Sequence, residues 1–370
     1  MDLHVMLPWE LEEEILSRLP PKSLVRCRAV SKRWNSLFND KSFINKHLCL
    51  SRPQFIFMTK SKIYSIDIID QSIDLRELHS SCRDLNSEYG NINTWDDLLF
   101  CEYPFDSKKG IALWNPWLRH VNWIKLSVDR DFEVFGLGYD NSRPQKVHKI
   151  LLYLSYFPQP QKIAIYECAS QALRFIDTPG DNMHISEIDK RSHVLSLSGN
   201  LYWISYNYLT GEYFIRSFDF TREIFKPFCL FPFQVKHIKN EALLAVWKGD
   251  RLSLLKQCYL PRNEIEIWVM ENKIDVKEEV VWINLMTLTA SNLPNLSGMI
   301  YRVSYFIYDK TLFMCCDNGS RDPYVPCIPC IYIAKGDMCN MIPIGSGQDG
   351  WFTHSAYVPN LNSVPFTISD

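Results

Sequence analysis

The sequence predicts a mainly β protein, in which a small N-terminal unit of three helices precedes a β-propeller-like body of about six irregular blades. Up to about residue 50, apolar side chains recur at helical spacing; beyond it they alternate with polar ones. In this second part, two series of strand-like segments recur about every fifty residues. That period is typical of a four-stranded kelch-type blade. We therefore divide the chain into residues 1–50 and residues 51–370.

The helical unit opens with an amphipathic helix over residues 7–20. Leu11, Ile15 and Leu19 recur every four residues and therefore share one helix face. Pro8 suits a first helical turn, where the N–H that proline lacks would be unpaired in any case. Two consecutive prolines end the segment, because neither can donate a backbone hydrogen bond.

Shorter helical segments follow. Residues 22–30 carry an apolar stripe beside two arginines. Ser31 is a suitable N-cap for a third helix that carries Trp34. Asp40 or Ser42 can cap one further turn. The pattern thus predicts three or four short helices in some forty residues.

These helices carry more apolar surface than so small a unit can bury by itself. The residues that cannot all point inward are Leu7, Leu16, Leu19, Leu24, Val30 and Trp34. Their surplus predicts either a docking surface for another protein or a surface that the rest of the chain covers. The pattern alone favours neither alternative.

The same segment resembles an F-box. The similarity covers about residues 7–47 in order and spacing, and it rests on Leu7-Pro8, Glu10-Leu11, Glu14-Ile15-Leu16, Arg18-Leu19-Pro20, Ser23-Leu24, Arg28, Val30-Ser31-Lys32-Arg33-Trp34 and Leu37. The resemblance implies docking on a Skp-type adaptor and, through it, on the cullin of an SCF ubiquitin ligase. It therefore favours the docking surface. The residues that we expect to contact the adaptor, or to support the contact directly, are Leu7, Pro8, Ile15, Leu16, Leu19, Pro20, Leu24 and Trp34.

The strand-like segments of the body form two interleaved series. The first comprises residues 111–114, 163–166, 215–218 and 265–268, with looser members at 63–66 and 330–333. The second comprises residues 149–152, 200–203, 251–254 and 311–314. A sandwich or several stacked sheets would also show many short strands, but neither requires so even a period. Residues 74–106 show little period, and we expect them to be partly loop.

The body also resembles the plant F-box-associated domain over about residues 60–362. The similar phrases are Leu113-Trp114-Asn115-Pro116 followed by Arg119, Phe135-Gly136-Leu137-Gly138-Tyr139-Asp140 before His148-Lys149-Ile150, and the stretches 196–203, 217–223 and 356–361. Residues 153–161 look like a variable insertion. The resemblance implies a propeller-like domain that recognises proteins, but it indicates neither the target nor the face that binds it.

The composition is that of an ordinary soluble globular protein, with 46% hydrophobic and 22% charged residues. A net charge of −2 gives no electrostatic case for nucleic acid or an anionic membrane as partner. The sequence shows no apolar export signal and no run long enough to span a membrane. We therefore expect the twelve cysteines to be reduced thiols, and the protein to be cytoplasmic, nuclear or both.

Three constellations could suggest other chemistry. Cys327 and Cys330, with Cys315, Cys316 and Cys339 nearby, suggest zinc, but only one CxxC hook exists, so buried thiols are favoured. Residues 345–350 match GxGxxG, but a strand-like segment follows where a nucleotide site needs a helix, which favours a turn. Four basic residues could bind phosphate, but a solvated face, or a rim around the adaptor contact, is the better account; they are Arg26, Arg28, Lys32 and Arg33.

No arrangement of a nucleophile with a base is present in the sequence, so we expect no catalytic residue, cofactor or metal. We expect Trp114, Trp203 and Trp268 to pack between blades. The predicted function is that of a non-catalytic substrate-recognition subunit of an SCF ubiquitin ligase. One alternative is an adaptor-bound interaction protein without a ligase role. Another is a propeller that binds a glycan or small molecule.

Overall fold

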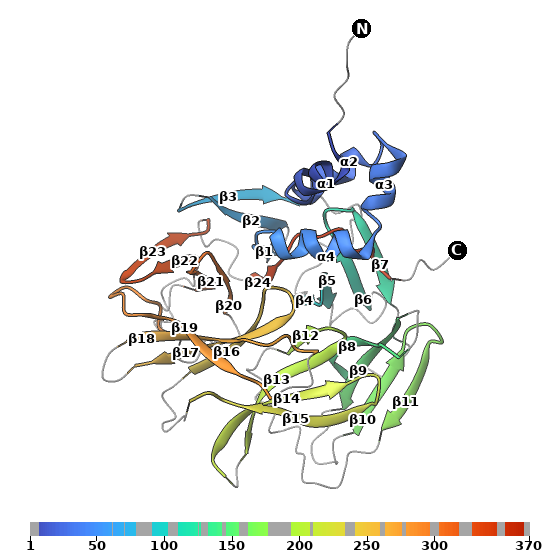
Figure 1. Cartoon of the computed structure of the whole chain (residues 1–370). Helices are drawn as coiled ribbons and strands as arrows, with labels where there is room; N and C mark the ends of the chain where they lie inside the picture. Colours follow the sequence, from blue (N-terminus) through green and yellow to red (C-terminus); the bar gives the residue numbers. More distant parts are fainter. Residues whose placement is uncertain are drawn as a thin grey trace.

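A computed structural model gives the fold of the chain (Figure 1). It describes residues 7–365 except 61, 70, 79–90, 103–109, 125, 127–131, 143–145, 155–161, 177–193, 208–209, 234–240, 260–262, 276–278, 297–302, 318–327 and 346–351. Within this part, four helices come first: α1 (Trp9–Ser17), α2 (Pro21–Cys27), α3 (Lys32–Leu37) and α4 (Lys41–Leu50).

The helix ends follow the caps that the sequence predicts. Pro8 and Pro20 stand at the N-cap positions of α1 and α2, so Pro8 lies just before the first turn instead of in it. The Ser31 Oγ accepts a hydrogen bond from the Trp34 backbone N–H at 3.5 Å. Asp40 accepts from the two amides that open α4. The fourth segment is a full helix of ten residues, longer than the single turn expected.

After the helices, the described residues form six four-stranded antiparallel blades (Figure 1). From the centre outward, blades 1 to 3 are β24 (Phe352–Tyr357), β1 (Gln54–Thr59), β2 (Ile63–Ile69), β3 (Ser72–Glu77); β4 (Asn91–Trp95), β5 (Leu98–Glu102), β6 (Ile111–Asn115), β7 (His120–Ile124); and β8 (Phe132–Asp140), β9 (Val147–Leu154), β10 (Lys162–Glu167), β11 (Ala172–Ile176). Blades 4 to 6 are β12 (Leu195–Leu197), β13 (Asn200–Asn207), β14 (Glu212–Asp219), β15 (Ile224–Leu230); β16 (Glu241–Trp247), β17 (Arg251–Cys258), β18 (Glu264–Met270), β19 (Trp282–Leu288); and β20 (Ser304–Tyr308), β21 (Thr311–Asp317), β22 (Pro329–Lys335), β23 (Met338–Pro343).

The two predicted strand series correspond to fixed positions in the blades. All six members of the first series are third strands: β2, β6, β10, β14, β18 and β22. The four members of the second series are second strands: β9, β13, β17 and β21. The predicted propeller of about six blades is therefore confirmed.

Residues 74–106, which the sequence predicts to be partly loop, contain much of β3 and all of β4 and β5; residues 79–90 and 103–106 lie outside the described residues. The strand β3 is the outer edge of blade 1, and its solvated side carries charged residues that break the apolar alternation. The strands β4 and β5 join through a tight turn at Asp96 and Asp97, which sequence inspection took for part of a loop. The strand β9 also extends over Tyr153 and Leu154, which were assigned to an insertion; its remainder, 155–161, lies outside the described residues.

The propeller closes by joining the two ends of its sequence. The last strand, β24, is the innermost strand of blade 1 and pairs antiparallel with β1 from Gln54↔Tyr357 to Thr59↔Phe352. One further irregularity joins blades 2 and 4, where Ser196 of β12 pairs in parallel with Trp95 of β4. Blade 1 is therefore complete only when the C-terminal strand is in place.

The end of β8 in blade 3 approaches the β12–β13 turn of blade 4 closely enough to require glycine. The Tyr139 backbone N–H donates to the Gly199 carbonyl at 3.0 Å, which holds β8 against the β12–β13 turn. A Cβ atom at Gly138 would clash with this carbonyl and with the Phe220 ring. The glycine of the phrase Phe135–Asp140 is thus explained by blade packing.

The helices sit on one face of the propeller. Leu118 of the β6–β7 turn and Leu361 after β24 pack into the core of the helical unit. The side chain of Leu48 in α4 lies beside Gly249 in the β16–β17 turn. We call this face, formed by the turns between first and second strands and between third and fourth strands, the helix-side face. The other ends of the strands form the far face.

Candidate functional site

An apolar row runs along the outer side of α1. Leu11 and Ile15 are one helical turn apart in α1, and Leu7 lies just before its N-cap, Pro8; the three residues are 51%, 52% and 53% exposed. The opposite side of α1 buries Leu16. Val30, which follows α2, is 71% exposed. Burial of such residues against a partner would be favourable by about 25 cal/mol per Å² of apolar surface. The row is therefore a candidate protein-binding surface.

The structure separates the eight residues predicted for adaptor contact into two groups. Four are exposed, namely Leu7, Pro8, Ile15 and Pro20, and two are half-buried, namely Leu19 and Trp34. Leu16 and Leu24 are 4% and 0% exposed and form the core of the helical unit with Phe38 and Phe43. These two can support the surface, but they cannot form it.

Sequence inspection left two exposed residues out of that set. Leu11 precedes Ile15 by four residues, so helical spacing alone could have placed it in the row. Val30 is exposed because it lies in the turn between α2 and α3, after the last residue of α2. Its exposure depends on where α2 ends, which the apolar pattern predicts only approximately.

Polar contacts border the apolar row and hold the helices together. The Trp34 indole N–H donates to Glu12 at 3.2 Å, and the Arg33 guanidinium lies 3.5 Å from the centroid of the Trp9 ring. Lys46 of α4 pairs with Glu14 of α1 at 2.9 Å. Arg33 thus serves a structural contact, which favours the interpretation of the basic residues as a rim.

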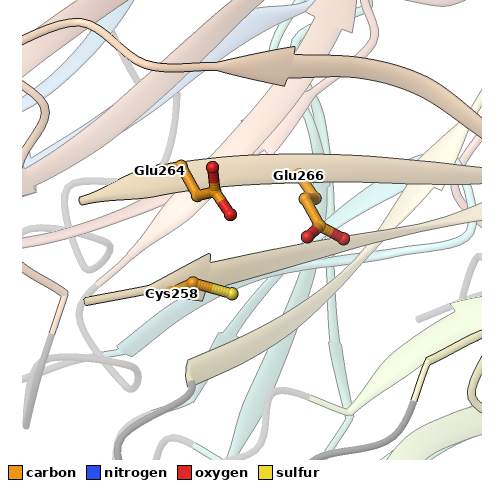
Figure 2. A group of neighbouring side chains, drawn as sticks. All are labelled: Cys258, Glu264 and Glu266. Atoms are coloured by element: carbon orange, nitrogen blue, oxygen red, sulfur yellow. The ribbon is translucent and has the colours of Figure 1, made fainter. Parts of the chain in front are cut away.

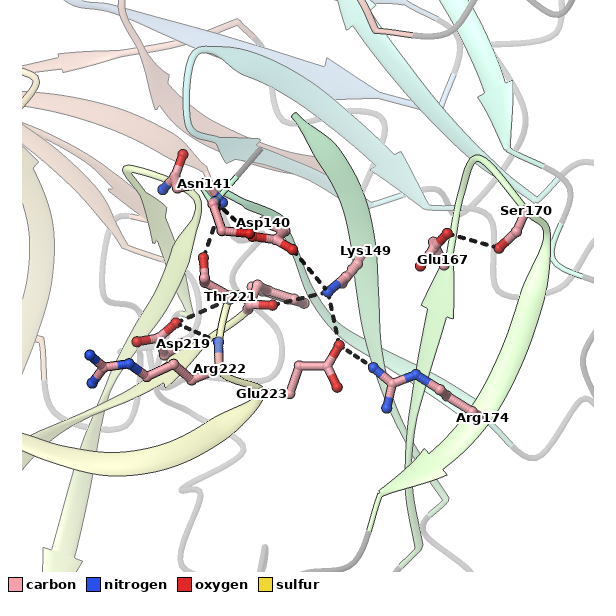
Figure 3. A network of polar contacts seen from close by, with 12 residues as sticks. Asp140, Asn141, Lys149, Glu167, Ser170, Arg174, Asp219, Thr221, Arg222 and Glu223 are labelled. Carbon is pink, nitrogen blue, oxygen red and sulfur yellow. Dashed lines mark hydrogen bonds and ion pairs between the residues drawn. The ribbon is translucent and has the colours of Figure 1, made fainter. Parts of the chain in front are cut away.

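The phrases that the sequence shares with F-box-associated domains meet at a polar network between blades 3 and 4 (Figure 3). The Lys149 ammonium is buried and contacts Glu223 at 2.8 Å, the Phe220 carbonyl at 3.2 Å and Asp140 at 3.9 Å. Arg174 pairs with Glu223 from the other side. Burial raises the pKa of Glu223, but the two cations outweigh it, so that this pKa lies below its usual value. The network holds two blades together and presents no unpaired reactive group.

The cysteines that suggested zinc lie mostly in the core of blade 6. Cys315, Cys316 and Cys330 are buried in β21 and β22, where Cys316 and Cys330 are register partners. Burial raises the pKa of Cys330 to about 11, which keeps the thiol protonated. Cys327 lies outside the described residues, as do positions 346–350 of the GxGxxG match; Gly345 precedes them, and β24 follows.

One group among the described residues has metal-ligand proximity: Cys258, Glu264 and Glu266, at adjoining ends of β17 and β18 (Figure 2). Glu266 is already engaged, because it pairs with Lys256 at 3.1 Å and accepts from the Trp268 indole N–H at 2.9 Å. Burial raises the pKa of the Cys258 thiol. A protonated thiol beside an ammonium group disfavours a cation, so we assign the group to the packing of blade 5.

Two family models match the chain. The model described as "F-box domain" matches residues 5–46, and that described as "F-box associated beta propeller domain" matches residues 54–364. The chain belongs to the F-box proteins with an associated propeller.

Similar proteins match this F-box protein along nearly its whole length. It is 53% identical over 382 aligned residues to Protein SUPPRESSOR OF NIM1 1 of Arabidopsis thaliana, an alignment that covers 98% of this chain and 99% of that protein. It is 49% identical to the Arabidopsis F-box protein At3g17710, over 98% of each chain. The helices α1–α4 are therefore the F-box, and the six blades are the associated domain. In the described part of the chain, no helix is long and apolar enough to cross a membrane.

Proposed function

We propose that this F-box protein is the substrate-recognition subunit of an SCF-type ubiquitin ligase, in which the F-box docks on a Skp-type adaptor and the propeller holds a target protein. The observation that carries the proposal is the row Leu7, Leu11 and Ile15, whose side chains remain about half exposed although the F-box is packed on the propeller. The subunit contributes proximity: it holds a lysine of the target near the ubiquitin-charged enzyme of the complex.

Co-purification with a Skp-type adaptor tests the docking step. The full chain is co-expressed with the adaptor, and Ile15→Asp and Leu11→Asp are compared with Leu75→Asp. Leu75, on the outer strand β3, is 44% exposed and serves as the matched control. A carboxylate in a buried apolar contact is costly, so we expect the two α1 variants to lose at least about tenfold in adaptor affinity. The control should bind as the wild type does.

Failure of the wild type to bind the adaptor would contradict the proposal, as would α1 variants that bind normally. Leu16→Ala is not suitable here, because Leu16 is buried and its loss would destabilise the F-box itself. Recovery of cullin in the same complex separates a ligase subunit from an adaptor-bound protein without a ligase role.

A further inference from the structure

A strip of aromatic rings spans blades 4 and 5 toward the far face. Its members, which we call the aromatic strip, are Tyr206, Tyr213, Phe231, Phe233 and Trp268. Consecutive rings are in contact, with centroids 4.7, 5.9, 5.3 and 6.0 Å apart in that order. Tyr206 and Tyr213 are cross-strand partners at the far-face end of the β13–β14 hairpin.

These rings keep part of their surface exposed. All five are half-buried, whereas Trp203, Phe218 and Phe220, between blades 3 and 4, are 0% exposed. Packing of the blades therefore does not account for the whole of the strip, and half-buried Tyr, Trp and Phe are the residues that protein interfaces favour.

Carboxylates lie at one end of the strip. Glu264 and Glu266 project from the same face of β18 (Figure 2). Trp268, two residues after Glu266, shares this face, because every second side chain of a strand points to the same side. Glu266 is paired with Lys256, whereas no hydrogen bond or ion pair joins Glu264 to another described residue. Among the described residues named here, two carboxylates thus face one ammonium group, and aromatic faces are themselves attractive to cations.

The strip already holds one cation in this manner. The Lys256 ammonium lies 4.7 Å from the centroid of the Phe233 ring and pairs with Glu266 at 3.1 Å. An arginine or lysine from another chain would find the same two kinds of group here: the half-buried ring faces of the strip, and the Glu264 carboxylate on the face of β18 that carries Trp268.

We propose that the aromatic strip is the target-binding surface of the propeller and that it takes an extended, basic segment of the target protein. This inference rests on the proposed function, because it assigns the target-binding step to a place. The strip lies toward the far face, whereas the F-box occupies the helix-side face, so both partners can bind together. A bound target would not cover Leu7, Leu11 or Ile15.

Fluorescence anisotropy of a labelled (Arg-Pro)5 peptide on the full chain tests the inference. Alternating proline keeps this probe extended, and (Glu-Pro)5 is its charge-reversed counterpart. We expect (Arg-Pro)5 to bind and (Glu-Pro)5 not to bind. Glu264→Lys and Tyr213→Leu should each weaken (Arg-Pro)5 binding about tenfold, since the first reverses the charge of a carboxylate beside the strip and the second removes one of its rings.

Two matched variants control for charge and for aromatic loss. Glu212→Lys makes the same charge change as Glu264→Lys, and it lies at the far-face end of blade 4 beside Tyr213. The Glu212 side chain points away from the strip, because neighbouring residues of a strand point to opposite faces and Tyr213 points into the strip. Phe175→Leu removes an aromatic side chain, 59% exposed, from blade 3. Both controls should change the peptide affinity less than about twofold.

Three results would overturn the inference: no binding of (Arg-Pro)5 at about 1 mM, equal binding of both peptides, or an equal loss in Glu212→Lys and Glu264→Lys. Glu264→Lys changes a side chain at the strand end and so keeps the test valid if Tyr213→Leu fails to fold. Adaptor co-purification is measured on the same preparations. If the chain binds the adaptor but not the peptide, only this inference is contradicted. If the chain does not bind the adaptor, the proposed function is contradicted.

Discussion

Asp96 is a residue whose environment opposes its charge. It lies in the β4–β5 turn with φ of 45°, and its carboxylate accepts a hydrogen bond from the Gly199 amide at 3.4 Å. Burial, and secondarily the adjacent Asp97, raise the pKa of Asp96 to about 7. The folded protein therefore holds this proton at pH values where the unfolded chain has released it.

Asp96→Asn should stabilise the protein, and the gain should depend on pH. A carboxyl group with a raised pKa favours folding at low pH and loses this contribution as pH rises from about 3.8 to 7. The amide retains the acceptor without the charge, and asparagine tolerates a positive φ. We expect urea unfolding to show a gain of about 1–2 kcal/mol at pH 8 and almost none at pH 4.

Asp309→Asn is the matched control for this measurement. Asp309 also lies in a turn between first and second strands with a positive φ of 47°, and its side chain is 84% exposed. Its substitution should leave the pH dependence unchanged. A gain in Asp96→Asn that is equal at pH 4 and pH 8 would contradict the titration of Asp96 as its cause.

The buried ion pair of Lys149 and Glu223 predicts a different outcome at the residue scale (Figure 3). Lys149 is only 6% exposed, and Glu223→Gln replaces the charged partner of its ammonium group with a neutral amide. We expect a loss of about 2–3 kcal/mol in the free energy of unfolding. Arg174→Ala removes the half-exposed partner of the same carboxylate and should cost less than about 1 kcal/mol. Equal losses in the two variants would show that burial does not govern this network.

At the scale of elements, the segment after β24 links the F-box to the propeller. Asn360 is fully buried; its amide donates to the Asp97 carbonyl, and its side-chain oxygen accepts from Asn115 at 3.1 Å. The next residue, Leu361, is 2% exposed and packs against the core of the F-box. Asn360 thus hydrogen-bonds this segment to blade 2, while Leu361 completes the core of the F-box helices.

Leu361→Ala should therefore destabilise the F-box although it lies some three hundred residues away in sequence. Loss of a fully buried leucine costs about 2–5 kcal/mol, because a cavity remains. Chemical denaturation and adaptor co-purification should both show the defect. Leu230→Ala, at a leucine that is 61% exposed, should cost less than about 0.5 kcal/mol. Normal adaptor binding and stability in Leu361→Ala would show that the F-box does not depend on this segment.

At the scale of the whole molecule, the two ends of the chain depend on each other. The C-terminal strand β24 completes blade 1 beside β1, and the segment behind it completes the F-box core. The helices and the six blades should then unfold together, because neither part keeps its full core without the other.

We expect scanning calorimetry of the full chain to show one unfolding transition. Deletion of residues 352–370 should abolish it, since blade 1 would lose its innermost strand and the F-box would lose Leu361. Deletion of residues 366–370 alone is the control and should leave the transition in place. Two separate transitions in the full chain would contradict this coupling.

The sequence pattern alone predicts the helices, the second and third strands of most blades, and the repetition of the blades. Proline and serine marked the helix ends, and the fifty-residue period identified second and third strands, because buried strands carry continuous apolar runs. The outer strand β3 was not predicted, because charged residues on its solvated side interrupt the apolar alternation. The strand β4 was not predicted either, because only a tight turn separates it from β5. Periodicity reports which residues are apolar, but not which of them remain uncovered.

Tertiary structure alone decided which apolar residues are core and which are surface. Leu16 and Ile15 are neighbours in the same helix, yet one is 4% and the other 52% exposed. The sequence also could not place Leu361 in the F-box, because a contact between chain ends has no local signature. Nor could it bring Tyr213, Phe233 and Trp268 together, since they belong to different blades. Local pattern follows from local chemistry, whereas exposure follows from what the rest of the chain packs against.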